Sequence, residues 1–408
     1  MKTDEYIELF PKRSDEIFLD NAASTRKPIP VLEAMDAYYR SSCGNIGRGS
    51  YRSARAAEAA VEECREKAKH FLGAGESDGI VFTHGATDGL NLLARGFAKS
   101  LRPGSNVVTT IAEHHSNLLP WMRACQQRGA QLRIAKPAVH TDDTGNRIVS
   151  FRAEDILTLV DSQTALIAIT ACSNVTGTCL PVGKIVEHSK KLGIPVVVDG
   201  AQFAAHQEAE FHSLGCDAMC LSAHKLYGPT GLGILCAKRS FLERLEPDDL
   251  GGGIVEDLNL AQGSVRFRED DGRFEAGTLP IAQIVGFSAA LTFLQQLGMY
   301  HIRMREDKLR KHLLSRMSAI EGIHCIHSGD GAAPLVSVNS DFMSSLDMAA
   351  MCDAQRIAVR AGKHCAFPFL DFLGEPATLR VSPCLYNTVE ELDIFASLLE
   401  SLQRRFRK

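Results

Sequence analysis

The chain has 408 residues, of which 45% are hydrophobic and 23% are charged. This composition supplies a large buried core and excludes a disordered, collagen-like or coiled-coil chain. The formal net charge of −4 gives no electrostatic reason to expect binding to nucleic acid or to a membrane. Length alone suggests roughly two or three domains.

The 12 cysteines are scattered and form no Cys-x-x-Cys pair, which argues against a zinc ribbon and a thioredoxin-like motif. The first six residues lack the apolar core of a secretory signal. The longest apolar stretch, residues 279–294, is interrupted by polar residues and is too short to span a membrane. We therefore expect a reduced, cytoplasmic protein with no disulfide framework and no metal site.

Short β-rich runs alternate with helical stretches between about residues 80 and 240. The runs at 106–111, 165–170 and 194–198 are predicted strands, and apolar residues at helical spacing lie between the last two. Continuous apolar strands with intervening helices indicate a parallel sheet that is covered on both faces. In such sheets the functional side chains gather beyond the carboxyl ends of the strands.

The pattern changes after about residue 280, where we expect a smaller α/β domain with its boundary near residues 265–285. A final helix should begin at Thr388, because Glu391 follows at the spacing of a capping box. The other predicted elements are one long helical stretch at 281–320, strands at 335–339, 357–360 and 378–382, and a helix at 345–354.

Two polar residues follow predicted strands and suggest a shared chemistry. Asp199 comes directly after the apolar run 195–198, and Lys225 lies shortly after the strand at 218–221. In isolation each has an ordinary explanation, a helix cap for the aspartate and a surface position for the lysine. Together they suit pyridoxal phosphate, because a lysine can hold this cofactor as a Schiff base while a carboxylate keeps its pyridine nitrogen protonated. Burial would help the lysine to lose its proton.

Two further segments are compatible with the same cofactor. The Gly-Ala-Thr turn at 85–87 precedes a predicted helix, so its backbone N–H groups and hydroxyl suit a phosphate. The run Glu113-His114-His115 follows the strand at 106–111, and one of its histidines could stack on an aromatic ring. An ordinary helix start and a structural histidine explain these segments equally well when each is taken alone.

The order of these segments resembles the class V aminotransferase-like group of pyridoxal phosphate enzymes, specifically the cysteine desulfurases of the SufS/CsdA type. The resemblance covers nearly the whole chain. The matching stretches are 19–23 (LDNAA), 113–121 (EHHSNLLPW), 173–177 (SNVTG), 198–202 (VDGAQ), 222–231 (SAHKLYGPTG), 251–253 (GGG), 274–278 (FEAGT), 360–366 (RAGKHCA), 379–382 (LRVS) and 386–388 (YNT).

The resemblance implies an α/β protein with the type I fold of pyridoxal-phosphate-dependent transferases. Its large domain would hold a mainly parallel seven-stranded sheet, and a smaller α/β C-terminal domain would carry the sulfur-accepting cysteine. The implied ranges are 1–25 for an N-terminal segment packing with the small domain, 26–275 for the large domain and 276–408 for the small domain.

The resemblance also implies a role for each matching residue. Lys225 would hold the cofactor and move the substrate α-proton, Asp199 would pair with the pyridine nitrogen, and His114 would stack on the ring and shuttle protons. Gln202 would hydrogen-bond the ring oxygen. The phosphate would be held by Ala86, Thr87, Ser222 and His224, and by Thr278 reaching across from a partner subunit, so a homodimer is implied.

The substrate would be L-cysteine, bound by Asn174, Arg360 and Arg380. A planar guanidinium suits the substrate carboxylate. Cys365 would act as a nucleophile, because its neighbours Arg360, Lys363 and His364 should lower the pKa of its thiol. It would take the sulfur as a persulfide, release alanine and pass the sulfur to an acceptor protein of SufE type, for iron–sulfur cluster assembly or tRNA thiolation.

Two positions depart from these enzymes: Gly47 stands where they commonly carry His, and Lys363 where they carry His or Gln. Three alternatives stay open. The first is a selenocysteine lyase or cysteine-sulfinate desulfinase, in which the enzyme thiol is dispensable. The second is another class V reaction, such as transamination or β-elimination. The third is a non-catalytic binding module.

Overall fold

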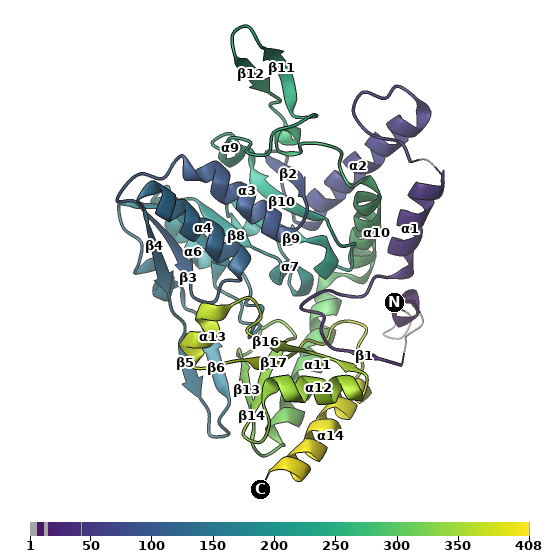
Figure 1. Ribbon diagram of the computed structural model, residues 1–408, viewed down its shortest axis with the longest axis vertical. Coiled ribbons are helices and arrows are strands. Elements are labelled where there is room, and N and C mark those ends of the chain that lie inside the picture. The colour runs from purple at the N-terminus through teal and green to yellow at the C-terminus, as the bar shows by residue number, and fades with distance from the viewer. Residues whose placement is uncertain (1–5, 12–14, 42, 408) are drawn as a thin grey trace.

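A seven-stranded sheet forms the centre of the computed structural model, which describes residues 6–11, 15–41 and 43–407 (Figure 1). All neighbouring strands in this sheet are parallel except β10, which runs antiparallel to β2 and β9. This confirms the expected mainly parallel sheet. The spatial order is β2 (Asp78–Thr83), β10 (Gly233–Lys238), β9 (Ala218–Ser222), β8 (Val196–Asp199), β7 (Thr164–Thr170), β3 (Asn106–Thr110) and β4 (Gln131–Ala135).

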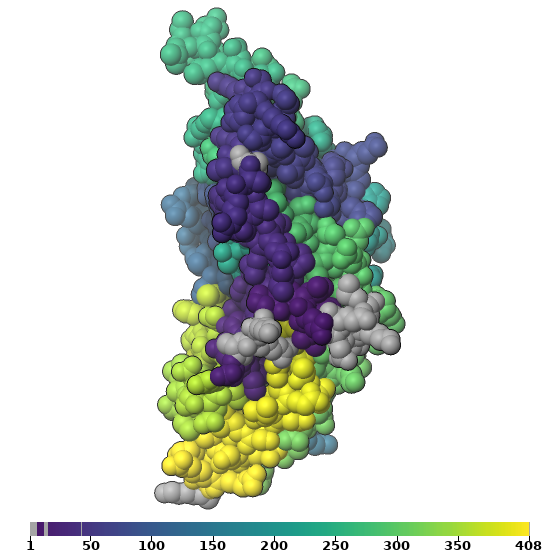
Figure 2. Space-filling model, turned by 90° about the vertical axis from the view of Figure 1, so that its right-hand side faces the viewer, coloured from purple at the N-terminus to yellow at the C-terminus, as the bar shows by residue number. Residues whose placement is uncertain are grey.

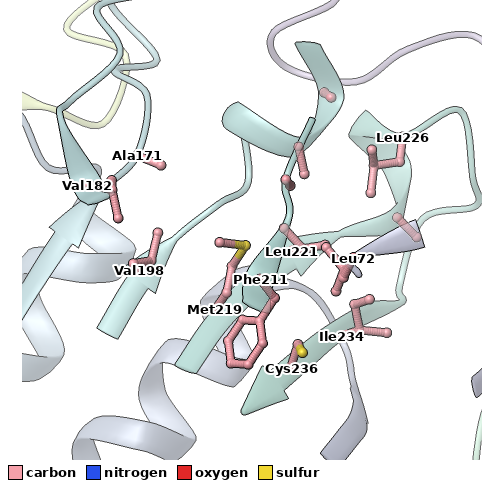
Figure 3. Close-up of a cluster of buried hydrophobic side chains, with 14 of the residues drawn as sticks. Leu72, Ala171, Val182, Val198, Phe211, Met219, Leu221, Leu226, Ile234 and Cys236 are labelled. Carbon is pink, nitrogen blue, oxygen red and sulfur yellow. The ribbon is translucent and has the colours of Figure 1, made fainter. Parts of the chain in front are cut away.

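Helices cover both faces of this sheet, because successive side chains of each strand point to opposite sides. Val196 and Val198 of β8 belong to one buried cluster, whereas Val197 belongs to another. Figure 3 shows Val198, Met219 and Leu221 on one face. The first face packs against α1 (Ile29–Ser41), α2 (Arg52–Phe71), α6 (Val182–Lys191), α8 (Phe211–Leu214) and α10 (Ile281–Leu297), and the second against α3 (Ala86–Ala98), α4 (His115–Arg128) and α9 (Arg239–Leu242).

A second sheet of six strands lies below the first in Figure 1. It includes β5 and β6, which come from the middle of the chain, inside the range that was expected to form the large domain alone. The strand order is β16 (Arg360–Gly362), β17 (Thr378–Val381), β14 (Val336–Ser340), β13 (Ile323–His327), β6 (Arg147–Ser150) and β5 (Ala138–Thr141). The helices packed with it are α11 (Met299–Ser318), α12 (Ser345–Ala354) and α14 (Val389–Phe406).

The C-terminal elements confirm some of the predicted boundaries and correct others. The helix at 345–354 and the Thr388 capping box are confirmed. The single helical stretch at 281–320 is wrong: it breaks at Gly298, where the backbone adopts a positive φ, and α10 and α11 meet at 78°. α10 packs against α1 and α2 of the large domain, although it lies within the range 276–408 that was expected for the small domain. The strand expected at 357–360 is two short strands.

The N-terminal part of the chain joins the small domain through backbone pairing. β1 (Ile17–Phe18) runs parallel to β15 (Ile357–Ala358), and Asp20 bridges to Ser382. In Figure 2 the purple N-terminal region runs along the molecule and meets the yellow C-terminal helix. Residues 1–5 and 12–14 of the expected N-terminal segment, 1–25, lie outside the described part of the chain.

A hairpin of β11 (Val255–Asn259) and β12 (Ser264–Phe267) projects from the end of the molecule opposite the small domain (Figure 1). Within the described residues, no single helix is long and apolar enough to cross a membrane; α10 and α11 meet the length and composition test only as a bent pair. The shorter elements are η1 (Ile7–Leu9), α5 (Ala153–Leu157), α7 (Phe203–His206), η2 (Ala223–Lys225), η3 (Asp271–Phe274) and α13 (Phe367–Leu373).

Candidate active site

A cavity of about 560 Å³ lies where the carboxyl ends of β7, β8 and β9 face the small domain. The structure brings together there every predicted cofactor and substrate residue except Thr278. These residues are Ala86, Thr87, His114, Asn174, Asp199, Gln202, Ser222, His224, Lys225, Arg360, Cys365 and Arg380. The sequence order scatters them over almost 300 positions, so the parallel sheet and the crossing of the chain between domains assemble the site.

The aspartate and the lysine lie on neighbouring strands of the sheet. Asp199 is the last residue of β8, and its Oδ1 accepts a hydrogen bond of 3.0 Å from the Ala201 N–H. Burial raises the pKa of Asp199 above its ordinary value. Lys225 ends η2, three residues after β9, and burial lowers the pKa of its ammonium group to about 8 against the opposing attraction of Asp199. A substantial fraction of the lysine is therefore neutral in mildly alkaline solution.

The first turn of α3 forms a corner of the cavity that suits an anion. The Ala86 N–H donates to the Ser222 Oγ at 2.9 Å, and the exposed Thr87 adds a hydroxyl. The loop before the helix depends on two glycines. Gly85, in the loop, has φ +151°. Gly233, at the start of the neighbouring β10, lies so close to the loop that a Cβ on it would be 2.5 Å from the Gly85 Cα. The hydroxyls of Ser222 and Thr87 and the positive end of the helix favour a phosphate at this corner.

Two histidines in the cavity are neutral at physiological pH. Burial, with a smaller contribution from the Lys225 charge, lowers the pKa of both His114 and His224 to about 4. The Nδ1 of His114 accepts a hydrogen bond of 3.1 Å from the Ser116 N–H, which caps α4. The proton of the neutral ring therefore resides on Nε2, and His114 offers the cavity a flat, uncharged ring.

Two buried amides of the cavity have oxygen atoms that no described group satisfies. Gln202 Nε2 donates to the Ala22 carbonyl at 2.8 Å, but its Oε1 has no hydrogen-bond partner among the described residues. Asn174 Nδ2 donates to the His364 carbonyl at 2.7 Å, and its Oδ1 is likewise without a partner there. A buried polar atom without a partner is costly, so these atoms favour a polar ligand. The lysine, carboxylate, anion corner and unmatched amides together fit pyridoxal phosphate.

The two predicted substrate arginines converge on one carboxylate that the sequence argument missed. Asp20 accepts from Arg360 at 2.7 Å and from Arg380 at 3.2 Å. Arg380 is buried and also donates to the Asn174 carbonyl at 3.0 Å, whereas Arg360 is half exposed. The Nε of Arg380 has no partner in the described part of the chain. Asp20 lies in the matched stretch 19–23, but nothing in that stretch alone indicates a pairing 360 residues away.

Cys365 is exposed and lies in a strained loop before α13. His364 and Cys365 have φ values of +50° and +55°, in the left-handed region that costs a residue with a side chain about 1–2 kcal/mol. Hydrogen bonds from the large domain hold the loop. The His115 N–H donates to the Cys365 carbonyl at 2.8 Å, and the Phe367 N–H donates to the His115 Nε2 at 3.2 Å. His115 is thus a site residue whose role the sequence argument did not separate from that of its neighbour.

The structure gives each basic neighbour of Cys365 a partner of its own. Burial lowers the pKa of His364 to about 3, so its ring is neutral, and its Nε2 is directed to the Thr378 side chain at 2.8 Å. Lys363 pairs with Asp371, and Arg360 pairs with Asp20. The carboxylates that pair with Lys363 and Arg360 were not visible in the local sequence, and the effect of these basic residues on the Cys365 thiol stays a prediction.

Thr278 is exposed and lines a separate cavity of about 1070 Å³. Gly47 and Arg48, from the segment that departs from the resembled enzymes, line the same cavity. Within this chain, Thr278 therefore has no access to the first cavity. Among the described residues there is also no group of three or more His, Cys, Asp or Glu side chains that could hold a metal ion.

Comparison with known proteins agrees with this geometry. The model of the aminotransferase class-V family matches residues 17–395. A probable cysteine desulfurase of Halalkalibacterium halodurans is 37% identical over 413 residues, covering 100% of this chain and 99% of the relative. A cysteine desulfurase of Salmonella gallinarum is 34% identical, covering 95% of this chain and 93% of the relative.

Solved structures give the same result in three dimensions. The apo structure of a cysteine desulfurase from Thermococcus onnurineus has a TM-score of 0.91 and 33% identity, covering 99% of this chain and 98% of that one. The cysteine desulfurase CsdA of Escherichia coli has a TM-score of 0.90 and 29% identity, covering 100% and 99%. These matches confirm the resemblance and the fold that it implied. The chain belongs to the aminotransferase class-V family.

Proposed function

We propose that this protein is a pyridoxal-phosphate-dependent cysteine desulfurase, which converts L-cysteine to L-alanine and retains the sulfur as a persulfide on Cys365. The observation that carries the proposal is an exposed cysteine thiol in the same cavity as Lys225 and the buried Asp199. The names of the relatives support the same activity.

When bound, pyridoxal phosphate supplies an electron sink that weakens the bonds around the substrate α-carbon. Lys225 would attach the cofactor, and Asp199 would face its pyridine nitrogen. The first turn of α3, with Ser222 and His224, would hold the phosphate. Once released from the cofactor, the Lys225 amine is the base for the α-proton, because its pKa of about 8 leaves a useful neutral fraction. The neutral ring of His114 would cover one face of the cofactor and can exchange a proton at Nε2.

Arg380 and Asn174 would orient the amino acid. The guanidinium of Arg380 is fixed by Asp20 and by the Asn174 carbonyl, so it does not need to be ordered when a carboxylate arrives. The unmatched Asn174 Oδ1 and Arg380 Nε are the polar atoms left for the ligand. Arg360, half exposed at the cavity edge, adds a second positive charge for the same carboxylate.

Cys365 would perform the sulfur transfer. Its Sγ attacks the sulfur of the bound substrate, so an S–S bond forms while the bond between that sulfur and Cβ breaks. The electrons of the broken bond and, in net terms, the thiol proton end on Cβ, which becomes the methyl group of L-alanine. The enzyme keeps the persulfide. The exposure of Cys365 suits the next step, in which an acceptor thiol must reach the same sulfur.

The test is alanine release from L-cysteine by the purified protein with a thiol reductant present. We expect catalytic alanine formation by the wild type and a loss of at least about 10³-fold in Cys365→Ala. Cys43→Ala, which removes the other exposed cysteine, is the matched control and should retain full activity. L-Selenocysteine should still yield alanine with Cys365→Ala, because selenium can leave as the element without an enzyme thiol while the electrons of the broken bond stay on Cβ. Full alanine release by Cys365→Ala from L-cysteine would refute the persulfide role.

The wider setting is part of the same proposal. The sulfur acceptor would be a protein of SufE type, and two copies of the chain would form a homodimer in which Thr278 of each copy completes the phosphate site of the other. The exposure of Thr278 beside a large second cavity supports this arrangement. A cytoplasmic location is supported by twelve free thiols, which suit a reducing compartment. Size measurement in solution tests the dimer directly.

A further inference from the structure

Two cysteines outside the proposed mechanism face each other across the turn that carries Asn174. An isolated antiparallel bridge pairs Cys172 with Cys179. It is flanked by the bonds Leu180 N–H to Ala171 O and Ser173 N–H to Thr178 O, both 2.9 Å long. The cysteines therefore occupy a non-hydrogen-bonded pair, in which the Cα atoms lie about 4.5 Å apart. That separation is at the close end of the disulfide range, which is about 4.4–6.8 Å.

The two sulfur atoms also point to the same place. The Sγ of Cys172 is 3.5 Å from the Gly177 carbonyl oxygen, and the Sγ of Cys179 is 3.8 Å from that same atom. Both cysteines are free thiols. Rotation about their side-chain bonds is thus sufficient to bring the sulfurs together, without movement of the strands.

The two thiols have different surroundings, which favour the thiolate at Cys179 and the protonated thiol at Cys172. Contact with the Cys172 thiol lowers the pKa of Cys179, and the Ala333 backbone, Arg303 and Arg310 add to this effect. The same contact, together with burial, raises the pKa of Cys172. Cys179 is only half-buried, so a small oxidant can reach its sulfur, whereas Cys172 is buried in the wall of the substrate cavity.

We propose that Cys172 and Cys179 form a reversible disulfide when the protein meets a peroxide, which makes this wall of the site a redox-modification site separate from Cys365. Cys179 attacks the peroxide, so an S–O bond forms and the O–O bond breaks, releasing water. Cys172 then attacks the Cys179 sulfur, forming the S–S bond while the S–O bond breaks and a second water leaves with the Cys172 proton. Two thiols lose two electrons to one peroxide, and a low-molecular-weight thiol reverses the change.

The disulfide would stiffen a turn that links both domains. Gly177, inside the turn, accepts a hydrogen bond of 3.0 Å from the Ala333 N–H of the small domain. Asn174, two residues after Cys172, holds the His364 carbonyl beside Cys365. Closing this short loop should raise the midpoint of thermal unfolding by about 2–4 °C.

The experiment uses full-length Cys365→Ala protein with its cofactor bound, because this variant lacks the exposed site nucleophile. The protein is treated with hydrogen peroxide, unfolded with iodoacetamide present, and digested with trypsin. The tryptic peptide 153–184 contains Cys172 and Cys179 and no other cysteine. We expect most of this peptide to resist alkylation and to be lighter by two hydrogens, and we expect dithiothreitol to restore both alkylation sites. Cys365→Ala/Cys179→Ser should form no disulfide and show no thermal shift.

Cys220 and Cys236 provide a control inside the same sample. They lie on neighbouring strands, but Cys220 is opposite Leu235 and Cys236 is opposite Met219, so their side chains belong to different faces of the sheet. Their two tryptic peptides should stay separate. Full alkylation of Cys172 and Cys179 at peroxide levels that oxidise Cys365 in the wild type would overturn the proposal. So would linkage of Cys220 to Cys236 to the same extent, because oxidation would then not follow the folded geometry.

Discussion

The two walls of the site cavity are built in different ways. The large-domain wall consists of side chains at the ends of buried strands, where the 5% exposed Asp199 lies beside Thr170 and Cys220 in a continuous sheet. The small-domain wall consists of an exposed cysteine on a left-handed backbone, held by a few hydrogen bonds. The first wall is fixed by a core, and the second by contacts across the domain boundary.

The difference matches the chemistry proposed for each wall. Shifting the pKa of a lysine or an aspartate requires removal from water and a fixed geometry, which strand ends supply. A thiol that accepts sulfur from the substrate and passes it to another protein must stay accessible. A strained surface loop that is held by hydrogen bonds from the other domain can provide that access.

The largest effect should come from removing the lysine of the buried wall. We expect Lys225→Ala to reduce alanine release from L-cysteine by at least about 10⁴-fold, because the variant loses both the cofactor attachment and the proton-transfer group. The midpoint of thermal unfolding should not fall, since the variant removes a partly desolvated cation. The assay is alanine release at saturating pyridoxal phosphate.

Lys363→Ala is the matched control in the thiol loop. Lys363 pairs with Asp371 and faces the Phe367 ring, so its loss should change activity by less than about threefold. Comparable losses in the two variants would contradict the division of labour between the walls.

The sequence was informative about the buried wall for a physical reason. Apolar runs that end in Asp199 and shortly before Lys225 identify strand ends, and parallel strands place their ends at one edge. The cysteine that we propose to accept sulfur had no such signal among twelve cysteines, so only the resemblance to a known family singled out Cys365.

Long-range partners were not predictable from the sequence. Asp20 lies 340 and 360 residues from the arginines that it binds, and β5 and β6 join a sheet whose other strands follow residue 320. The break at Gly298 was missed because the residues on both sides of it are helical. Local periodicity describes each element, whereas these features depend on how distant elements pack.

His115 tests the connection between the walls. We expect His115→Ala to lower turnover of L-cysteine by about ten- to a hundredfold with little change in KM, because the Cys365 loop loses the hydrogen bond from the Phe367 N–H to the His115 Nε2 and the contact between the two rings. The bond from the backbone N–H of residue 115 to the Cys365 carbonyl remains. Turnover of L-selenocysteine should be unaffected, since that reaction does not need the thiol. His115→Gln keeps an acceptor near the Nε2 position and should restore part of the activity.

The double variant Cys365→Ala/His115→Ala shows whether His115 acts through the thiol. It should turn over L-selenocysteine as fast as Cys365→Ala alone. A further loss in the double variant, or an equal loss on both substrates in the single variant, would mean that His115 supports the fold of the site in general.

The pH dependence should report the buried wall. Lys225 would act as a base in its neutral form, and burial lowers its pKa to about 8, so the neutral fraction rises as pH increases through this value. Below it, kcat should increase about tenfold per pH unit and then level off, because the amine is free to act as a base only in the substrate complex. The profile of Lys363→Ala should be the same. A plateau that begins below about pH 6.5 would exclude Lys225 as the titrating base.

The smallest effect concerns the turn that joins the walls. Gly177 and Gly193 have almost equal φ values, +69° and +68°, so alanine at either position pays about 1–2 kcal/mol for the left-handed backbone. At Gly177 the added Cβ would also lie 2.7 Å from the Ala333 carbonyl oxygen of the small domain, whereas nothing lies within 4 Å at Gly193. We therefore expect Gly177→Ala to lower the free energy of unfolding by about 1–2 kcal/mol more than Gly193→Ala in chemical denaturation. Equal losses would mean that the contact between this turn and Ala333 of the small domain can give way with little loss of stability. The small-domain wall would then rely on the His115 and Asn174 hydrogen bonds alone.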